Sequence, residues 1–170
     1  MKSWLKAGKV LSTIVYVASL VVVPLIILSI ISVNTFGNEP LAQIGGTTVY
    51  GLLVDAGIHQ EEHLTEMLVI IAIYGIAAVI SSCAAMRFFA GELKKDAFPS
   101  QECGRSCRKA GLWIAAVKLL AIIVSGLLYT LYRLEFAEYI ALAVEAVVSM
   151  LIGICFVVFS FVIEASEKII

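Results

Sequence analysis

Four long apolar runs dominate the pattern of hydrophobic and polar positions along the chain. They cover residues 10–33, 67–86, 110–132 and 139–163. The first two runs hold no charged residue, whereas the third holds Lys118 and the fourth holds Glu145. A helix needs about 20 apolar residues to cross roughly 30 Å of hydrocarbon, and each run reaches that length. The pattern predicts an all-α fold, an integral membrane bundle of four transmembrane helices that forms one domain over residues 1–170.

The composition agrees with this class, because 61% of the residues are hydrophobic, against roughly half in soluble domains. The first run follows three lysines, as the apolar part of a signal peptide would. It is longer, however, than a signal-peptide core of about 7–15 residues, and no small-residue cleavage site follows it. We therefore expect a retained helix rather than a cleaved leader.

The basic residues are confined to particular segments. Residues 34–66 contain neither Lys nor Arg, and their charged residues are all acidic. The segment between the second and third runs carries Arg87, Lys94, Lys95, Arg105, Arg108 and Lys109. Lys and Arg beside a span are retained on the cytoplasmic side. We therefore expect both termini inside (N-in, C-in), residues 34–66 as the one long outer loop, and a tight outer turn near residues 133–138.

Small and polar residues form a stripe along three of the predicted spans. The stripes consist of Ala77, Ser81 and Ala85, beside Ser82, in the second span, of Gly111, Ala115, Lys118, Ile122 and Ser125 in the third, and of Ala141, Glu145, Ser149 and Gly153 in the fourth. Small residues mark the faces where membrane helices approach closely. Both charged residues lie on such stripes, so we expect them to face protein or a water-filled cavity rather than lipid.

Lys118 and Glu145 are candidate functional residues, because a charged group inside the membrane is costly. Counted from a turn near Leu134, they are offset by five residues, or about 7–8 Å of helix rise, so a direct ion pair would be strained. Structural roles are the alternative. Lys118 would then extend toward the inner interface, with Ser81 and Ser82 as hydrogen-bond acceptors, and Glu145 would be a neutral carboxyl group bonded to a neighbouring helix.

The segment from His59 to His63 matches the H-x-x-E-H pattern of inverted zincins. Two histidines four residues apart on a helix can share a metal ion, with Glu62 as a base and Glu66 as a third ligand. The alternative is a solvated acidic cap, because Glu is favourable near a helix N-terminus. We expect the cap, since no folded catalytic domain surrounds the segment. His59 and His63 remain the candidates for metal binding.

The remaining sequence holds no pattern that indicates a reaction. Cys103 and Cys107 form C-x3-C, which is short of the four ligands of a tetrahedral zinc site, and the cytoplasm keeps such thiols reduced. The sequence has no phosphate-binding loop, nucleophile elbow or dinucleotide fingerprint. The basic cluster before the third span suits topology and attraction to anionic lipid. We expect no enzyme activity, no cofactor and no binding to nucleic acid.

The inner segment reads Arg87-Phe88-Phe89-Ala90-Gly91-Glu92-Leu93-Lys94-Lys95-Asp96-Ala97-Phe98, followed by Cys107-Arg108-Lys109-Ala110-Gly111. With these residues the middle of the chain resembles the domain-of-unknown-function 2975 (DUF2975) family of small four-span bacterial membrane proteins. The longer first outer loop, the tight second outer turn and the Gly-containing last span with an acidic tail also agree. The resemblance implies no established activity or catalytic residue. Because such proteins often occur beside small helix-turn-helix regulators, it implies a regulatory or stress-linked role.

Two functional hypotheses follow from these patterns. The first is a non-enzymatic regulatory, accessory or immunity-like protein of the bacterial cytoplasmic (inner) membrane. It would contact the lipid bilayer and bind a membrane-protein partner or form a homo-oligomer, and enlarging Ser149 or Gly153 would disrupt that complex. The second is a small ion- or proton-coupled transporter or channel subunit that uses Lys118 and Glu145. We favour the first, because no internal repeat or pair of broken helices indicates a secondary transporter.

Overall fold

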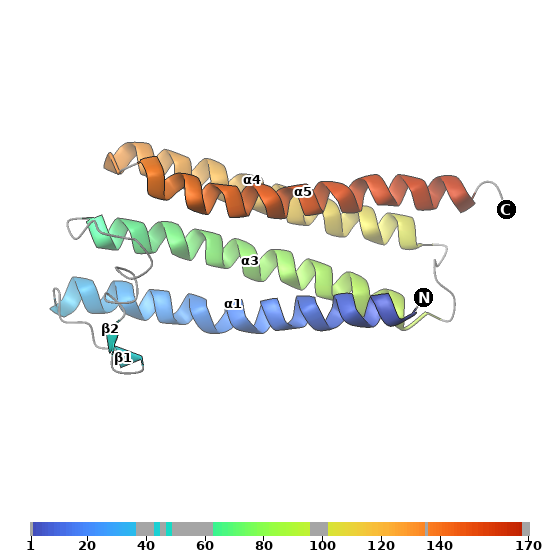
Figure 1. The fold of residues 1–170 in the computed structure, drawn as a ribbon, viewed down its shortest axis with the longest axis horizontal. Coiled ribbons are helices and arrows are strands. Elements are labelled where there is room, and N and C mark those ends of the chain that lie inside the picture. The colour runs from blue at the N-terminus through green and yellow to red at the C-terminus, as the bar shows by residue number, and fades with distance from the viewer. Residues whose placement is uncertain are drawn as a thin grey trace.

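The computed structural model describes residues 2–36, 43–44, 47–48, 63–95, 102–134 and 136–167. These residues include helices α1 (Lys2–Phe36), α3 (Leu64–Leu93), α4 (Cys103–Tyr132) and α5 (Phe136–Glu167) (Figure 1). Each of the four contains a segment long and apolar enough to cross a membrane. The predicted all-α fold with four membrane-spanning helices is therefore confirmed, and the chain is a multi-pass membrane protein.

The helices are longer than the apolar runs that predicted them. α1 begins at Lys2, so the basic residues before the first run belong to the helix, and α1 continues through Pro24. α3 continues past its run to Leu93, and α4 begins at Cys103, well before its run. A helix pairs its own backbone groups, so it can pass from hydrocarbon into water without exposing unpaired ones. The apolar runs located the spans but underestimated the helices.

A short β-hairpin belongs to the segment between α1 and α3. Its strands are β1 (Gln43–Ile44) and β2 (Thr47–Thr48), which run antiparallel with Gln43 opposite Thr48 and Ile44 opposite Thr47. Figure 1 places this hairpin near the end of α1. Most of the predicted outer loop lies outside the described residues.

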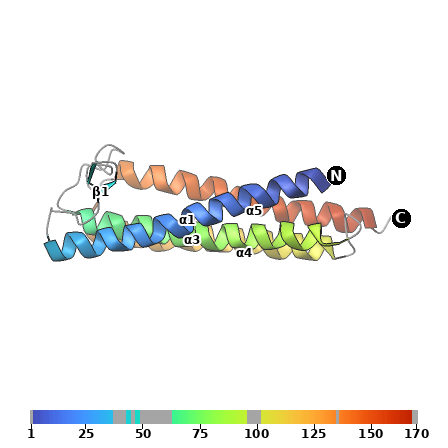
Figure 2. The same cartoon turned by 90° about the horizontal axis from the view of Figure 1, so that it is seen from below.

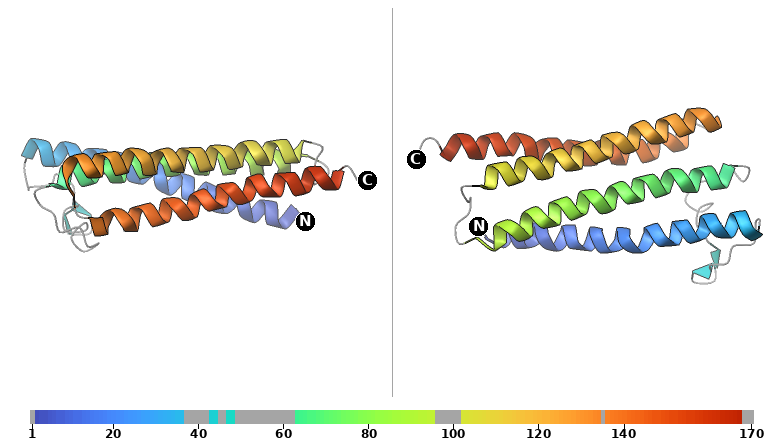
Figure 3. Two further views of the ribbon diagram at one scale, coloured as in Figure 1. Left: turned by 90° about the horizontal axis from the view of Figure 1, so that it is seen from above. Right: turned by 180° about the vertical axis from the view of Figure 1, so that it is seen from behind.

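The helices pack in a row rather than around a common axis. α1 packs along α3, α3 packs along α4, and α4 packs along α5, while α3 and α5 make a smaller contact. The right view of Figure 3 shows α1, α3 and α4 side by side, with α5 against α4. The two chain termini lie at one end of the molecule in Figures 1 and 2. We call this the basic end, because it also carries the basic residues of the α3–α4 segment.

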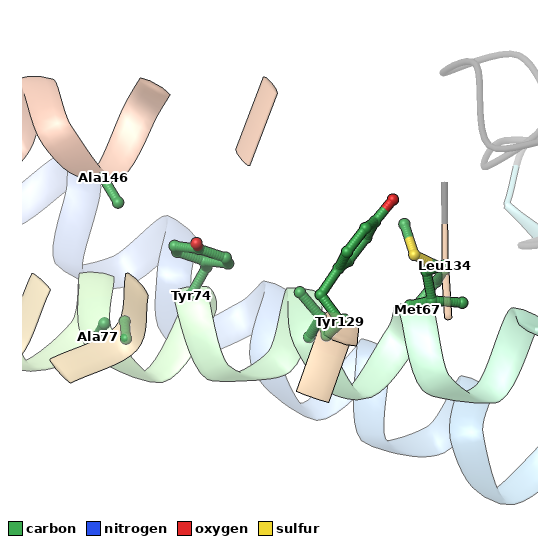
Figure 4. Close-up of a cluster of buried hydrophobic side chains, with 8 residues drawn as sticks. Met67, Tyr74, Ala77, Tyr129, Leu134 and Ala146 are labelled. Carbon is green, nitrogen blue, oxygen red and sulfur yellow. The ribbon is translucent and has the colours of Figure 1, made fainter. Parts of the chain in front are cut away.

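A cluster of buried side chains joins α3, α4 and α5 (Figure 4). Its members are Met67, Ile70, Tyr74, Ala77, Ala121, Tyr129, Leu134 and Ala146. Leu134 enters this cluster directly after α4 ends, because Arg133 has a left-handed φ of 56° and the Leu134 N–H donates to the Tyr129 carbonyl at 3.3 Å. This pattern is that of a Schellman motif. It turns the chain back onto the core before α5 begins.

α4 carries the seam on which its two neighbours pack. Its buried residues follow steps of three and four and include Cys103, Cys107, Ala110, Ile114, Lys118, Ala121, Ser125 and Tyr129. This spacing is typical of helices that cross at a small angle. The seam determines the position of the candidate site, because Lys118 is one of its members.

Candidate functional site

Lys118 lies inside the bundle at the middle of α4, fifteen residues from Cys103 and fourteen from Tyr132. Only 3% of the residue is exposed. Within the described part of the chain, Lys118 makes no hydrogen bond or ion pair. The prediction that Lys118 faces the interior is therefore confirmed. Its side chain is buried among protein atoms and does not extend along the lipid-facing surface of the bundle.

The packing of α3 against α4 places Ser81 at the level of Lys118. The Tyr74 and Ser125 hydroxyls are hydrogen-bonded at 2.8 Å, which fixes the register of these antiparallel helices. Seven residues along each helix from that pair, two turns or about 10 Å, lead to Ser81 and Lys118. We call Tyr74, Ser81, Lys118 and Ser125 the polar file. All four are buried.

The serine hydroxyls near Lys118 are engaged with their own helix. The Ser81 hydroxyl donates to the Ala77 carbonyl at 2.7 Å, and the Ser82 hydroxyl donates to the Ala78 carbonyl at 2.6 Å. Their oxygen lone pairs remain as acceptors. Ser81 and Ser82 thus line the interior as predicted, and they surround the level of Lys118 with acceptors rather than with charge.

Glu145 does not face the interior. Its side chain is exposed on the surface of α5, whereas the adjacent Ala146 is fully buried. The buried residues Ala146, Gly153 and Ser160 repeat every seven positions, so the seam of α5 follows that period. A stripe at spacing four rotates by about 40° at each step, since successive helix residues are about 100° apart. The expectation that Glu145 faces protein was therefore wrong, because the stripe leaves the seam before it reaches Glu145.

An offset along the helix axes separates Lys118 from Glu145, as expected, but it is smaller than five residues. A side-chain carbon on Gly153 would lie 2.8 Å from both the Gly111 carbonyl oxygen and the Ala115 nitrogen, so Gly153 is at a level between Gly111 and Ala115. Counted from that level, Lys118 on α4 is opposite Val148 on α5. Glu145 is three residues further along α5, or about 4–5 Å of helix rise.

Lys118 and Glu145 do not form an ion pair. The salt bridges among the described residues are Glu92–Lys95 and Arg108–Glu164. One charge is buried in the seam and the other is outside it. The pair thus consists of an interior cation and a carboxylate presented at the surface of the bundle.

The basic end has its own network of ionic contacts. Glu92 is 1% exposed and accepts a hydrogen bond from the Lys95 ammonium at 2.8 Å. This hydrogen bond with Glu92 raises the pKa of Lys95. Arg108 pairs with Glu164 across α4 and α5, and its guanidinium lies 4.5 Å from the centre of the Phe161 ring. These contacts hold the ends of neighbouring helices together.

The cysteines and histidines do not form a metal centre in the described part of the chain, where no group of three His, Cys, Asp or Glu side chains could hold an ion. Cys103 and Cys107 are buried free thiols, and the Cys107 thiol donates to the Phe156 carbonyl at 3.2 Å. His63 precedes α3, and its buried Nδ1 has no hydrogen-bond partner there. His59, the other predicted ligand, lies outside the described residues, so the metal hypothesis stays a prediction.

Sequence reasoning missed two polar residues of the interior, Tyr74 and Glu92. Tyr74 is seven residues from Ser81, so a search for positions two turns apart would have placed both on one face. Glu92 follows the apolar run, which ends at residue 86. No local signal marks its burial, which depends on α3 continuing as a helix to Leu93.

The fold and these contacts define the chain as a four-span membrane protein with a polar interior site. A scan against models of protein families gives no match, and searches of curated proteins and of solved structures give none either. The resemblance to the DUF2975 family consequently stays a prediction that rests on the residues quoted for it.

Proposed function

We propose that this protein is a non-enzymatic regulatory, accessory or immunity-like protein of the bacterial cytoplasmic membrane, and that it binds another transmembrane helix across α5. The observation that carries this proposal is the exposed Glu145 carboxylate. A charged residue inside a membrane span is costly, by up to about 2.5–3.5 kcal/mol at the helix centre on insertion scales. Binding to a partner helix would offset that cost.

The surroundings of Glu145 support a partner rather than an aqueous opening. Val144 and Val148, on the same outer surface, are about half exposed and apolar. Glu145 is nine residues, or about 14 Å, from the start of α5, so it lies within the apolar run and not at the helix end. A side chain with a hydrogen-bond donor on a partner helix would satisfy the carboxyl group, as polar residues do between membrane helices.

A photo-crosslinking experiment tests the proposal. A photoreactive amino acid placed at Val148, one turn from Glu145, should give a defined adduct with a second membrane protein in cells. The same amino acid at Leu120, an exposed residue of α4, serves as the matched control. Mass spectrometry identifies the partner.

The carboxyl group itself is tested with Glu145→Gln and Glu145→Leu. We expect the Val148 adduct to fall about five- to thirtyfold in Glu145→Leu, because a buried interhelical hydrogen bond contributes about 1–2 kcal/mol. Glu145→Gln keeps a polar group and should retain part of the adduct. An adduct of equal yield in all variants would contradict the proposal, and an adduct with a second copy of the chain would identify a homo-oligomer instead.

The polar file supports a second candidate function, an ion- or proton-coupled transporter or channel subunit. Lys118, Ser81 and the Tyr74–Ser125 pair are buried at one helix interface, and intramembrane polar groups of this kind mark ion pathways in many proteins. Proton or cation flux into liposomes tests this candidate. It requires that Lys118→Met abolish a flux seen with the unaltered protein, whereas the accessory role requires no flux at all.

A further inference from the structure

A groove of about 540 Å³ opens between α1, α3 and α4 near the basic end. Its lining includes Tyr16, Val79, Arg87, Ser106, Lys109 and Trp113. The lining is polar at one end, apolar along the other, and contributed by three helices. We propose that this groove binds an anionic membrane phospholipid, with the phosphate between Arg87 and Lys109 and the upper acyl chain along the apolar wall. This inference is independent of the role proposed for Glu145.

The two cations lie at the level where a headgroup would be. Arg87 is six residues before the end of α3 and Lys109 is six residues after the start of α4, so each is about 9 Å from its helix end. A 30-residue helix is about 45 Å long. Since the hydrocarbon layer is roughly 30 Å thick, about 7 Å of helix extends beyond it at each end. Arg87 and Lys109 therefore lie at the boundary between hydrocarbon and headgroups.

The rest of the groove extends from that boundary into the hydrocarbon layer. Trp113 is one turn deeper than Lys109, and Val79 is two turns, or about 12 Å, deeper than Arg87. Tyr16 of α1 contributes a second aromatic side chain. Trp and Tyr are enriched at the interface because one part of the ring is apolar and another is polar. This apolar wall can contact an acyl chain, whereas free phosphate would make no contact with it.

The described lining of the groove carries a positive charge. It includes no carboxylate, and in the described ranges Arg87 and Lys109 form no ion pair or hydrogen bond. The nearby carboxylates of Glu92 and Glu164 are engaged with Lys95 and Arg108 instead. Basic pockets between membrane helices bind anionic headgroups in this way. The Ser106 hydroxyl adds a donor for a phosphate oxygen.

A neighbouring cavity shows why the charge matters. It has a volume of about 290 Å³ and is lined by apolar and aromatic side chains that include Leu5, Phe88, Phe89 and Phe156. The described residues that line it include no cation, so they offer no discrimination between headgroups. Selectivity for anionic lipid should therefore depend on Arg87 and Lys109.

Tryptophan fluorescence provides a direct test in lipid. The chain has two tryptophans, so Trp4→Phe leaves Trp113 in the groove as the reporter. The purified full chain is placed in bilayers in which either phosphatidylglycerol or phosphatidylcholine carries bromine atoms, which quench tryptophan. We expect about a tenfold preference of the groove for the anionic lipid, because each basic side chain near the surface favours it substantially. Inorganic phosphate should not relieve the quenching.

Three double variants assign the preference to the groove. The double variant Arg87→Gln with Lys109→Gln should lose the preference for the anionic lipid. The double variant Arg87→Lys with Lys109→Arg keeps both charges and should keep most of the preference, so it tests binding even if the neutral variant does not fold. Lys94→Gln with Arg105→Gln removes two exposed cations of the same end that do not line the groove, and should leave the preference unchanged. The proposal would be overturned if both brominated lipids quenched Trp113 equally. It would also be overturned if Lys94→Gln with Arg105→Gln lost the preference as fully as the groove variant, or if inorganic phosphate relieved the quenching.

Discussion

At the scale of single residues, Lys118 has the least ordinary environment among the described residues of the bundle. It is 3% exposed, it is at the middle of its helix, and it forms no ion pair in the described part of the chain. Removing an ion from water without a close partner costs several kcal/mol. A lysine in this position lowers the free energy of unfolding. We therefore expect it to serve a function, or to have a partner in an assembly that this single chain does not contain.

Replacement of Lys118 by methionine should therefore stabilise the isolated protein or leave its stability unchanged. Buried ionic groups exchanged for apolar residues of similar volume often raise the free energy of unfolding by about 1–4 kcal/mol. Thermal unfolding in detergent, followed by loss of helical circular dichroism, measures the effect. Lys94→Met, at an exposed position that does not line the groove, is the control and should change the free energy of unfolding by less than about 0.5 kcal/mol. A clear loss of stability in Lys118→Met would show that the ammonium group makes a structural contact.

Lys118 and Glu145 also show how much a local sequence pattern can predict about the face on which a residue lies. The small and polar stripe of α4 correctly placed Lys118 inside, because that stripe follows the steps of three and four of the seam. The same reasoning failed for Glu145, one position away from the buried Ala146. A single step on a helix turns a side chain by about 100°, so a stripe that drifts slightly can assign a residue to the wrong face.

At the scale of helices, the α4–α5 pair depends on backbone contact at two glycines. Gly111 and Gly153 face each other, and a side-chain carbon on Gly153 would lie 2.8 Å from the Ala115 nitrogen and from the Gly111 carbonyl oxygen. Small residues permit this approach between membrane helices. Gly153 is thus part of an internal interface. The earlier expectation that it faces a partner was wrong, because the stripe joined it to Glu145 although only Gly153 is in the seam.

Substitution of Gly153 by alanine should destabilise the fold, by about 1–3 kcal/mol as expected for overpacking. Gly91→Ala is a matched control, since a side chain there would meet no atom within 4 Å. Alanine in a helix is favoured over glycine, so Gly91→Ala should stabilise α3 by up to about 1 kcal/mol. Thermal unfolding of both variants, measured in the same detergent, gives the comparison. Equal effects of the two substitutions would contradict close packing at Gly153.

At the scale of the whole molecule, the four helices form two hairpins whose main connection is the packing of α3 on α4. α1 and α5 therefore expose most of their apolar surface, which includes many large side chains. In water such a surface would cause aggregation. In a membrane this apolar surface contacts lipid or other helices. A polar residue on the surface, such as Glu145, marks a place where contact with lipid is unfavourable.

The distribution of charge predicts the orientation of the molecule. The basic end carries both termini and the Lys and Arg residues between α3 and α4, and such residues stay in the cytoplasm. A fluorescent protein fused to the C-terminus should fluoresce, and alkaline phosphatase fused there should be inactive. Fusions made after Phe36, at the end of α1, should behave in the opposite way. Active phosphatase at the C-terminus would reverse the assigned topology.

The sequence by itself determined that the chain crosses a membrane four times and roughly where each span lies. It also determined that the two ends of the helix bundle differ in charge. These properties depend on sums over about 20 residues, and each helix satisfies its own backbone groups without help from its neighbours. Local sequence is therefore sufficient to determine them.

Only the tertiary structure decided which faces meet. It brought Lys118 level with Ser81, placed Glu145 outside the seam, buried Glu92, and joined Arg87 and Lys109 in one groove. These relations depend on the register between helices and on rotations of less than one residue step. Both are set by contacts between residues far apart in the chain, in particular by Gly111 with Gly153 and by the turn after α4.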